Sequence, residues 1–188
     1  TAAFFQGPVG LTGIYDSDPS TSTFASSLTV GSTGYLVGGT GDEFIMLGDF
    51  FNHSTQNMLW DTDMAEILFK GGRTHHVDFG SAGGGGFLDN FAWGELFIDT
   101  TDVLDISGDV IYVGLLHLSS LDQLTGNGII YYDASLSGND YLRTLAGSPG
   151  GGAQLLPIGG GGSGTAPEPG TLLLVALVLA AAAGPLQS

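Results

Sequence analysis

The chain has 188 residues, enough for one folded domain with a hydrophobic core and further segments. Nineteen Asp and Glu residues face three Lys and Arg residues, so the formal net charge is −16 and nucleic-acid partners are excluded. The chain has no cysteine, which excludes disulfide bonds, thiolate catalysis and cysteine-bound zinc. With 43% apolar residues and 33 glycines, the composition predicts a folded domain with glycine-rich loops.

The first three residues, Thr1-Ala2-Ala3, are small, as residues beside a signal-peptidase site are. We therefore expect an exported protein from which a leader has been removed. The acidic surface would keep such a glycine-rich chain soluble outside the cytoplasm.

Residues 1–147 carry nearly all the aromatic and charged residues, in short β-branched and aromatic runs separated by turn-forming residues. The predicted strands are Ser27–Val30, Tyr35–Val37, Glu43–Phe50, Glu66–Phe69, His75–Phe79, Gly94–Asp99, Asp109–Leu118 and Ile129–Tyr132. Their number and spacing predict an extracytoplasmic domain that is mainly β, an antiparallel β-sandwich or jelly roll. No repeat with a fixed period is visible.

Three segments of this region have features of their own. The segment Asp109–Leu118 is almost continuously apolar, as in a strand buried on both faces. The segment Asn57–Phe69 has mixed apolar spacing and is a candidate short helix. Ser119–Leu124 begins with serine and continues with acidic and glutamine residues, which predicts one helical turn.

The C-terminal part is divided in two. Residues 148–165 are rich in glycine and are expected to form a flexible linker. Residues 166–188 begin with Pro167-Glu168-Pro169, followed by Thr171 and an apolar run. This tail resembles the PEP-CTERM family of bacterial sorting signals. The resemblance implies recognition by a membrane exosortase, and it concerns delivery of the protein and not the role of the β domain.

The apolar run itself favours contact with a membrane. Twelve residues, from Leu172 to Ala183, have no polar side-chain atom, and as a helix they would span roughly 18 Å against about 30 Å of bilayer hydrocarbon. We expect a C-terminal hydrophobic membrane helix, in which the tail is either cleaved or retained as an anchor. Its expected membrane-contacting residues are Leu172, Leu173, Leu174, Val175, Leu177, Val178 and Leu179.

The four histidines give little indication of a metal site. His75 and His76 are neighbours, so on a strand their side chains point to opposite faces. His117 lies in the most apolar segment and is expected to be a hydrogen-bonded core residue. A trio of His53, His75 and an Asp is a further candidate for metal binding.

Pairs of aspartates are the second candidate for a cation site. An Asp-x-Asp pair on a strand places both carboxylates on one face, which suits the oxygen preference of calcium, although no EF-hand loop is present. Turn and cap positions on a soluble surface are the simpler interpretation. The candidate calcium ligands are Asp16, Asp18, Asp61, Asp63, Asp99 and Asp102.

No catalytic motif is present: the sequence contains neither a Gly-x-Ser-x-Gly elbow nor a phosphate-binding loop. We therefore predict a non-enzymatic, exported structural protein of the bacterial envelope or surface, periplasmic or at the cell surface and associated with the membrane through its C-terminus. One alternative is an accessory structural subunit of a photosynthetic, respiratory or fibre assembly, docked through a retained tail. Another is a calcium-assisted carbohydrate-binding module, in which aspartate pairs would lie near Trp60 or Trp93.

Overall fold

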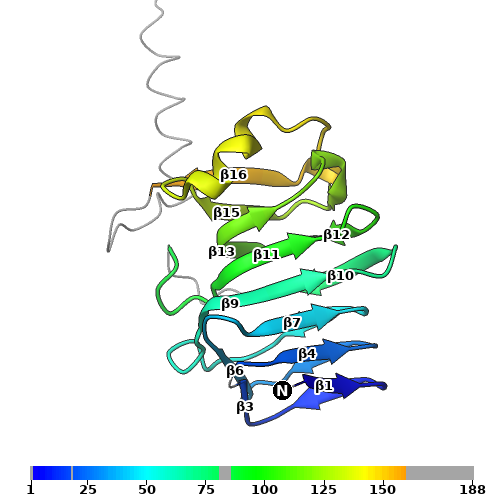
Figure 1. Ribbon diagram of the computed structural model, residues 1–188, viewed down its shortest axis with the longest axis vertical. Coiled ribbons are helices and arrows are strands. Elements are labelled where there is room, and N and C mark those ends of the chain that lie inside the picture. Colours follow the sequence, from blue (N-terminus) through cyan, green and yellow to red (C-terminus); the bar gives the residue numbers. More distant parts are fainter. Residues whose placement is uncertain (1, 18, 81–85, 160–188) are drawn as a thin grey trace, which may run out of the picture.

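The computed structural model describes residues 2–17, 19–80 and 86–159. In this part of the chain every paired strand is parallel to its neighbours, and each strand of a sheet pairs with the strand of the next coil. The fold is a β-solenoid whose coils are stacked from β1 to β16 along the long axis of the molecule (Figure 1). The antiparallel β-sandwich or jelly roll predicted from the sequence is therefore wrong, although the mainly β composition is confirmed.

The coils form three sheets. The long sheet has the order β1 (Ala2–Phe5), β4 (Thr21–Phe24), β7 (Glu43–Met46), β9 (Thr62–Phe69), β11 (Trp93–Ile98), β13 (Val110–His117), β15 (Ile129–Asp133) and β16 (Gln154–Ile158). The second sheet has the order β14 (Leu124–Thr125), β12 (Val103–Asp105), β10 (Thr74–Asp78), β8 (Phe50–Asn52), β5 (Leu28–Val30) and β2 (Val9–Leu11). A short sheet pairs β3 (Ile14–Ser17) with β6 (Tyr35–Gly38) and continues through a bridge between Val37 and Asp61.

The coils differ in length, because loops of different size leave the solenoid at its corners. The coil that begins at Ala2 returns to the long sheet at its ladder partner Thr21, whereas the coil that begins at Glu66 returns only at Glu95 and is clearly longer. The strand ladder continues across both coils, since the extra residues lie outside the paired segments. Unequal coils explain why the sequence shows no fixed repeat.

The interior of the coils forms a single large core. In β9, Ala65, Ile67 and Phe69 point inward and are fully buried, whereas Met64 and Glu66 point outward. This alternation is the two-residue period of a strand with one face in the core. Aromatic rings from different coils meet inside, and the Phe44 and Trp93 ring centroids are 5.2 Å apart. Burial of each such side chain stabilises the fold by roughly 1.5–3 kcal/mol.

Strand β13 is buried on both faces only around Tyr112, so the prediction from its apolar sequence is confirmed for part of the strand. Ile111 and Val113 point into the core. Tyr112 points outward, yet it is only 5% exposed because it stacks on Tyr131 with ring centroids 5.1 Å apart. A small second apolar cluster therefore covers the outer face of the long sheet at this level.

Three local predictions have different outcomes. The candidate helix Asn57–Phe69 is wrong, because Thr62–Phe69 forms β9. The helical turn is confirmed as η1 (Leu121–Gln123), in which the Ser120 hydroxyl accepts the Asp122 N–H and the Gln123 side-chain oxygen accepts the Ser120 N–H. The predicted linker 148–165 contains η3 (Gly150–Gly152) and β16, so the solenoid extends further than residue 147.

Two further elements complete the description. The helix η2 (Ser137–Thr144) follows β15 and contacts β13. No helix within the described residues is long and apolar enough to cross a membrane. The C-terminal membrane helix expected from the sequence falls on residues 166–188, which lie outside the described part of the chain.

Candidate functional site

Three grooves meet where β9 begins, and Asp63 lines all of them. They have volumes of about 440, 420 and 530 Å³, which is the size range of small-ligand sites. We name them the glycine groove, the aspartate groove and the methionine groove after the residues described below. Asp63 is thus the residue at which these three grooves adjoin.

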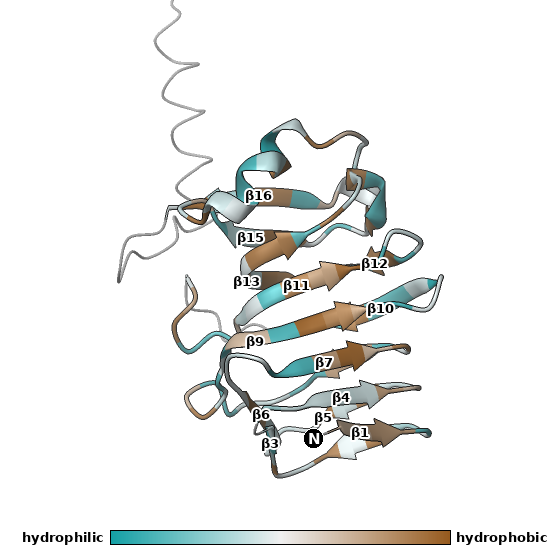
Figure 2. Ribbon diagram, in the orientation of Figure 1, coloured by the Kyte–Doolittle hydropathy of each residue, from teal (hydrophilic) through white to brown (hydrophobic). Residues whose placement is uncertain are grey.

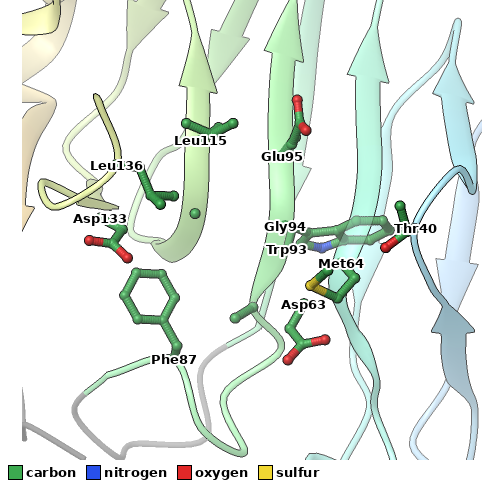
Figure 3. Close-up of a pocket in the computed structure, with 12 residues that line it drawn as sticks. Thr40, Asp63, Met64, Phe87, Trp93, Gly94, Glu95, Leu115, Asp133 and Leu136 are labelled. Atoms are coloured by element: carbon green, nitrogen blue, oxygen red, sulfur yellow. The ribbon is translucent and has the colours of Figure 1, made fainter. Parts of the chain in front are cut away.

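The glycine groove runs over the outer face of the long sheet (Figure 3). Asp63 and Met64 lie on one side and Phe87 and Leu136 on the other. Two glycines on neighbouring strands, Gly94 and Gly114, line its floor, and a methyl group on Gly114 would lie 2.5 Å from the Gly94 carbonyl oxygen. The ladder between β9 and β11 shifts register between Trp93 and Glu95. The groove exists because Gly94 and Gly114, at this irregularity of the sheet, have no side chains to fill it.

The aspartate groove brings together three of the candidate calcium ligands, Asp16, Asp61 and Asp63, with Asp42 beside them. They come from successive coils, since β3, β6 and Asp61 stack in register. Burial raises the pKa of Asp42, but hydrogen bonds from the Ser17 hydroxyl and two backbone N–H groups outweigh it and lower the pKa below its ordinary value. Asp42 is thus a structural anchor of this corner.

Asp61 and Asp63 form an interacting carboxyl pair. Burial raises the pKa of Asp63, and the charge of Asp61 and a hydrogen bond with it raise it further. Within the described residues, no group of three or more His, Asp or Glu side chains is arranged to hold a metal ion.

The remaining calcium candidates lie elsewhere. Asp102 is fully buried at the end of the turn between β11 and β12. Asp99 caps the start of the same turn, where its side chain accepts the Thr100 N–H. Asp18 lies outside the described residues. The six aspartates thus do not form one site.

The tryptophans do not provide the sugar platform that the carbohydrate-binding hypothesis requires. Trp60 and Trp93 are 8% and 1% exposed, and their rings pack against each other in the core. The Trp60 indole N–H donates to the Thr62 hydroxyl at 2.7 Å. The Trp93 indole nitrogen is buried and has no hydrogen-bond partner among the described residues.

The histidines occupy four separate environments. His75 is buried and His76 exposed, which confirms that neighbouring side chains on β10 point to opposite faces. His117 was predicted to be a core residue, and this is wrong. It lies on the outer face of the long sheet, where its Nε2 atom is 3.0 Å from a carboxylate oxygen of Glu95. His53 lies 3.8 Å from Asp78 on the surface, so it does not join His75 in a metal trio.

A column of glutamates that the sequence analysis missed extends across the outer face of the long sheet. Glu43, Glu66 and Glu95 are register partners on β7, β9 and β11. Burial raises the pKa of Glu66, the charges of Glu43 and Glu95 raise it further, and His117 lowers it. The three glutamates are far apart in the sequence and unequally spaced, so they give no motif to recognise.

The methionine groove is formed by two loops, one between β8 and β9 and one before β11. Several large apolar side chains of this region are exposed: Met58 by 78%, Leu59 by 52%, Leu88 by 85% and, between this groove and its neighbours, Met64 by 61%. Sequence analysis missed this surface, because such residues are not distinguished from core residues by type alone.

No family model, curated protein or solved structure matches the chain. The sorting-motif residues Pro167, Glu168, Pro169 and Thr171 lie outside the described residues, as does the tail through which an accessory subunit would dock. The geometry of the described residues is therefore the basis for assigning a role to the solenoid.

Proposed function

We propose that the chain is a non-enzymatic, exported structural protein of the bacterial envelope or surface. The observation that carries this proposal is the unbroken parallel ladder of the long sheet, which runs from β1 to β16 over one core. Such a solenoid is a stiff, extended body, because each coil is hydrogen-bonded to the next. A spacer or scaffold outside the cytoplasm requires this property and no catalytic group.

The buried imidazole–carboxylate pair supports a structural role. His75 and Asp102 resemble two members of a catalytic triad, yet both are fully buried and both ring nitrogens are occupied by protein acceptors. A catalytic base must reach the proton that it removes. This pair instead connects β10 to the turn that precedes β12, and the same imidazole ring contacts the Gly48 carbonyl oxygen before β8.

The sorting role of residues 166–188 is the second part of the proposal and depends on the Pro167-Glu168-Pro169 motif. It is tested by supplying the chain with a Sec leader in two otherwise identical bacterial hosts, with and without an exosortase. We expect retention at the envelope in the host with the enzyme and release or mislocalisation in the other, as measured by fractionation and intact mass.

A double substitution of the motif, Pro167→Ala with Glu168→Ala, should reproduce the enzyme-free result in the complete host. Pro185→Ala changes a proline outside the motif and is the matched control. Identical localisation of all variants in both hosts would contradict the sorting role.

A further inference from the structure

Exposed apolar side chains around the methionine groove form one surface together with the half-buried Phe87. We call it the Met58–Leu88 surface and define it as Met58, Leu59, Met64, Phe87 and Leu88. Its two loops carry brown, hydrophobic segments on the same side of the solenoid (Figure 2). They lie side by side, since the Asn57 side chain donates to the Asp89 carbonyl oxygen at 2.9 Å. Large apolar side chains grouped in this way on a soluble protein mark interaction sites.

The loops present these side chains in a fixed arrangement. Asp89 and Phe91 have φ angles of 53° and 54°, a region that non-glycine residues avoid at a cost of roughly 1–3 kcal/mol. Phe91 is anchored in the core, with its ring 5.1 Å from that of Trp60. The backbone conformation thus turns Phe91 inward while Leu88 remains outside.

The surface is surrounded by carboxylates. Asp61, Asp63 and Asp89 line the methionine groove, and Glu95 and Asp133 line the adjoining glycine groove. Neither groove has a lysine or an arginine among its lining residues. An apolar centre with an acidic rim is complementary to a partner that brings apolar anchors and basic residues together.

The charges also argue against other occupants. A second copy of this chain would bring another −16 charges and only three Lys and Arg residues to the contact. An anionic lipid surface would be repelled for the same reason. A neutral apolar partner would leave the carboxylates at the rim without counter-charges.

We propose that the Met58–Leu88 surface binds a cationic amphipathic segment of another protein. Apolar side chains of the segment occupy the methionine and glycine grooves on either side of Phe87, which lines both. Lysine or arginine side chains of the same segment contact Asp61, Asp63 and Asp89 at the rim. This binding does not depend on the sorting role proposed for the tail.

The test is a titration of the full chain with synthetic twelve-residue peptides. A peptide of alternating Leu and Lys has both required properties, one of alternating Ser and Lys has the charge alone, and one of alternating Leu and Glu has the opposite charge. We expect the Leu–Lys peptide to bind at least ten times more tightly than either comparison peptide, as measured by calorimetry. Its affinity should fall as salt is raised from 50 to 300 mM, because the rim charges are screened.

Variants assign the binding to this surface. The double variant Met58→Ser with Leu88→Ser should weaken the Leu–Lys peptide about tenfold or more, since both apolar anchors are lost. The double variant Asp63→Asn with Asp89→Asn should weaken binding of the Leu–Lys peptide and reduce the salt dependence of that binding. Asparagine is suitable at position 89 because it tolerates a positive φ. Phe4→Ser is the matched control, because Phe4 is 65% exposed on β1, in the first coil.

Four outcomes would overturn the proposal. If the Ser–Lys peptide binds as tightly as the Leu–Lys peptide, the binding is only a general attraction to an acidic protein. If the Leu–Lys peptide binds the Met58→Ser, Leu88→Ser variant as tightly as the unsubstituted chain, the contact lies elsewhere. Self-association abolished by the same double variant would identify a second copy as the occupant. Binding to anionic vesicles abolished by it would identify a lipid surface. Unchanged melting temperatures of all variants would show that they remain folded.

Discussion

The Nε2 atom of His75 on β10 lies 2.9 Å from the Oδ1 atom of Asp102, in the turn before β12, and both side chains are fully buried. The Nδ1 atom of the same ring lies 2.7 Å from the Gly48 carbonyl oxygen. Each ring nitrogen of His75 thus lies within hydrogen-bonding distance of an oxygen atom. Burial raises the pKa of Asp102, but hydrogen bonds from the Arg73 N–H, His75 and the Gly72 N–H outweigh it and hold the pKa below its ordinary value.

The contributions of His75 and Asp102 to the free energy of unfolding should depend strongly on each other. Asp102→Ala leaves a buried imidazole and two backbone N–H groups without their acceptor, and we expect the free energy of unfolding to fall by about 3–5 kcal/mol. His75→Leu should cost a similar amount. The double variant should lose less than the sum, because neither partner is left alone. Urea unfolding of the four proteins measures the cycle, and additive losses would show that the two side chains are independent.

Asp109 makes stability depend on pH in the opposite direction from Asp102. Burial raises its pKa to about 6, although the Phe79 and Val110 N–H groups donate to its carboxylate. The folded state therefore binds a proton more tightly than the unfolded chain, whose aspartate has a pKa near 3.9. This contribution is fully present below about pH 4 and is lost as the pH rises through 6, a change of roughly 3 kcal/mol.

The measurement compares the chain with Asp109→Asn, which cannot titrate, by urea unfolding at pH 4, 5, 6 and 7.5. The difference in unfolding free energy between the two proteins should change by roughly 2–3 kcal/mol across this range in favour of Asp109 at low pH. Parallel pH profiles would mean that Asp109 does not titrate in this window. Asp140→Asn, on the short helix η2, is a matched control.

The glutamate column should respond to single substitutions in a predictable order. Glu43→Gln and Glu95→Gln each remove a charge that raises the pKa of Glu66, so each should lower that pKa. His117→Gln removes a group that lowers the pKa of Glu66, so it should raise it. Carboxyl carbon chemical shifts followed during an NMR titration report the Glu66 pKa directly. A Glu66 pKa that is the same in all three variants would show that the register partners do not interact.

The sequence allowed the strands to be located but not their arrangement. Tyr35–Val37 and Ile129–Tyr132 were identified from β-branched and aromatic residues, and both are strands. Short strands with glycine-rich turns are common to sandwiches and solenoids, so the direction of pairing is not encoded in them. A fixed repeat would have distinguished the two, but the coil from Ala2 to its partner Thr21 is much shorter than the coil from Glu66 to its partner Glu95.

The candidate site was predictable only in part. Asp61 and Asp63 were found because their spacing places them together locally. Their meeting with Asp16 depends on the stacking of three coils, which no local pattern indicates. The exposure of Leu88 depends on a loop conformation with positive φ at Asp89, which is unusual for a residue other than glycine. Both the meeting of Asp16 with Asp61 and Asp63 and the exposure of Leu88 therefore depend on tertiary structure that local sequence does not indicate.

The floor of the glycine groove gives a last prediction. A Cβ atom at Gly114 would lie 2.5 Å from the Gly94 carbonyl oxygen, so one of two neighbouring strands must move to admit Gly114→Ala. We expect a loss of about 1–3 kcal/mol of unfolding free energy, the usual cost of overpacking. Gly10→Ala is the matched control, because nothing lies within 4 Å of a Cβ there and the residue is also in a strand.

The same substitution should narrow the glycine groove, because the new methyl group lies on its floor beside Gly94. Gly114→Ala should therefore weaken the Leu–Lys peptide while Gly10→Ala leaves its affinity unchanged. Thermal melting and the peptide titration separate the two effects, since binding is measured well below the melting temperature. If Gly114→Ala has the same free energy of unfolding as the unsubstituted chain, β11 and β13 can move apart at this point without loss of stability. The groove floor would then not be rigid.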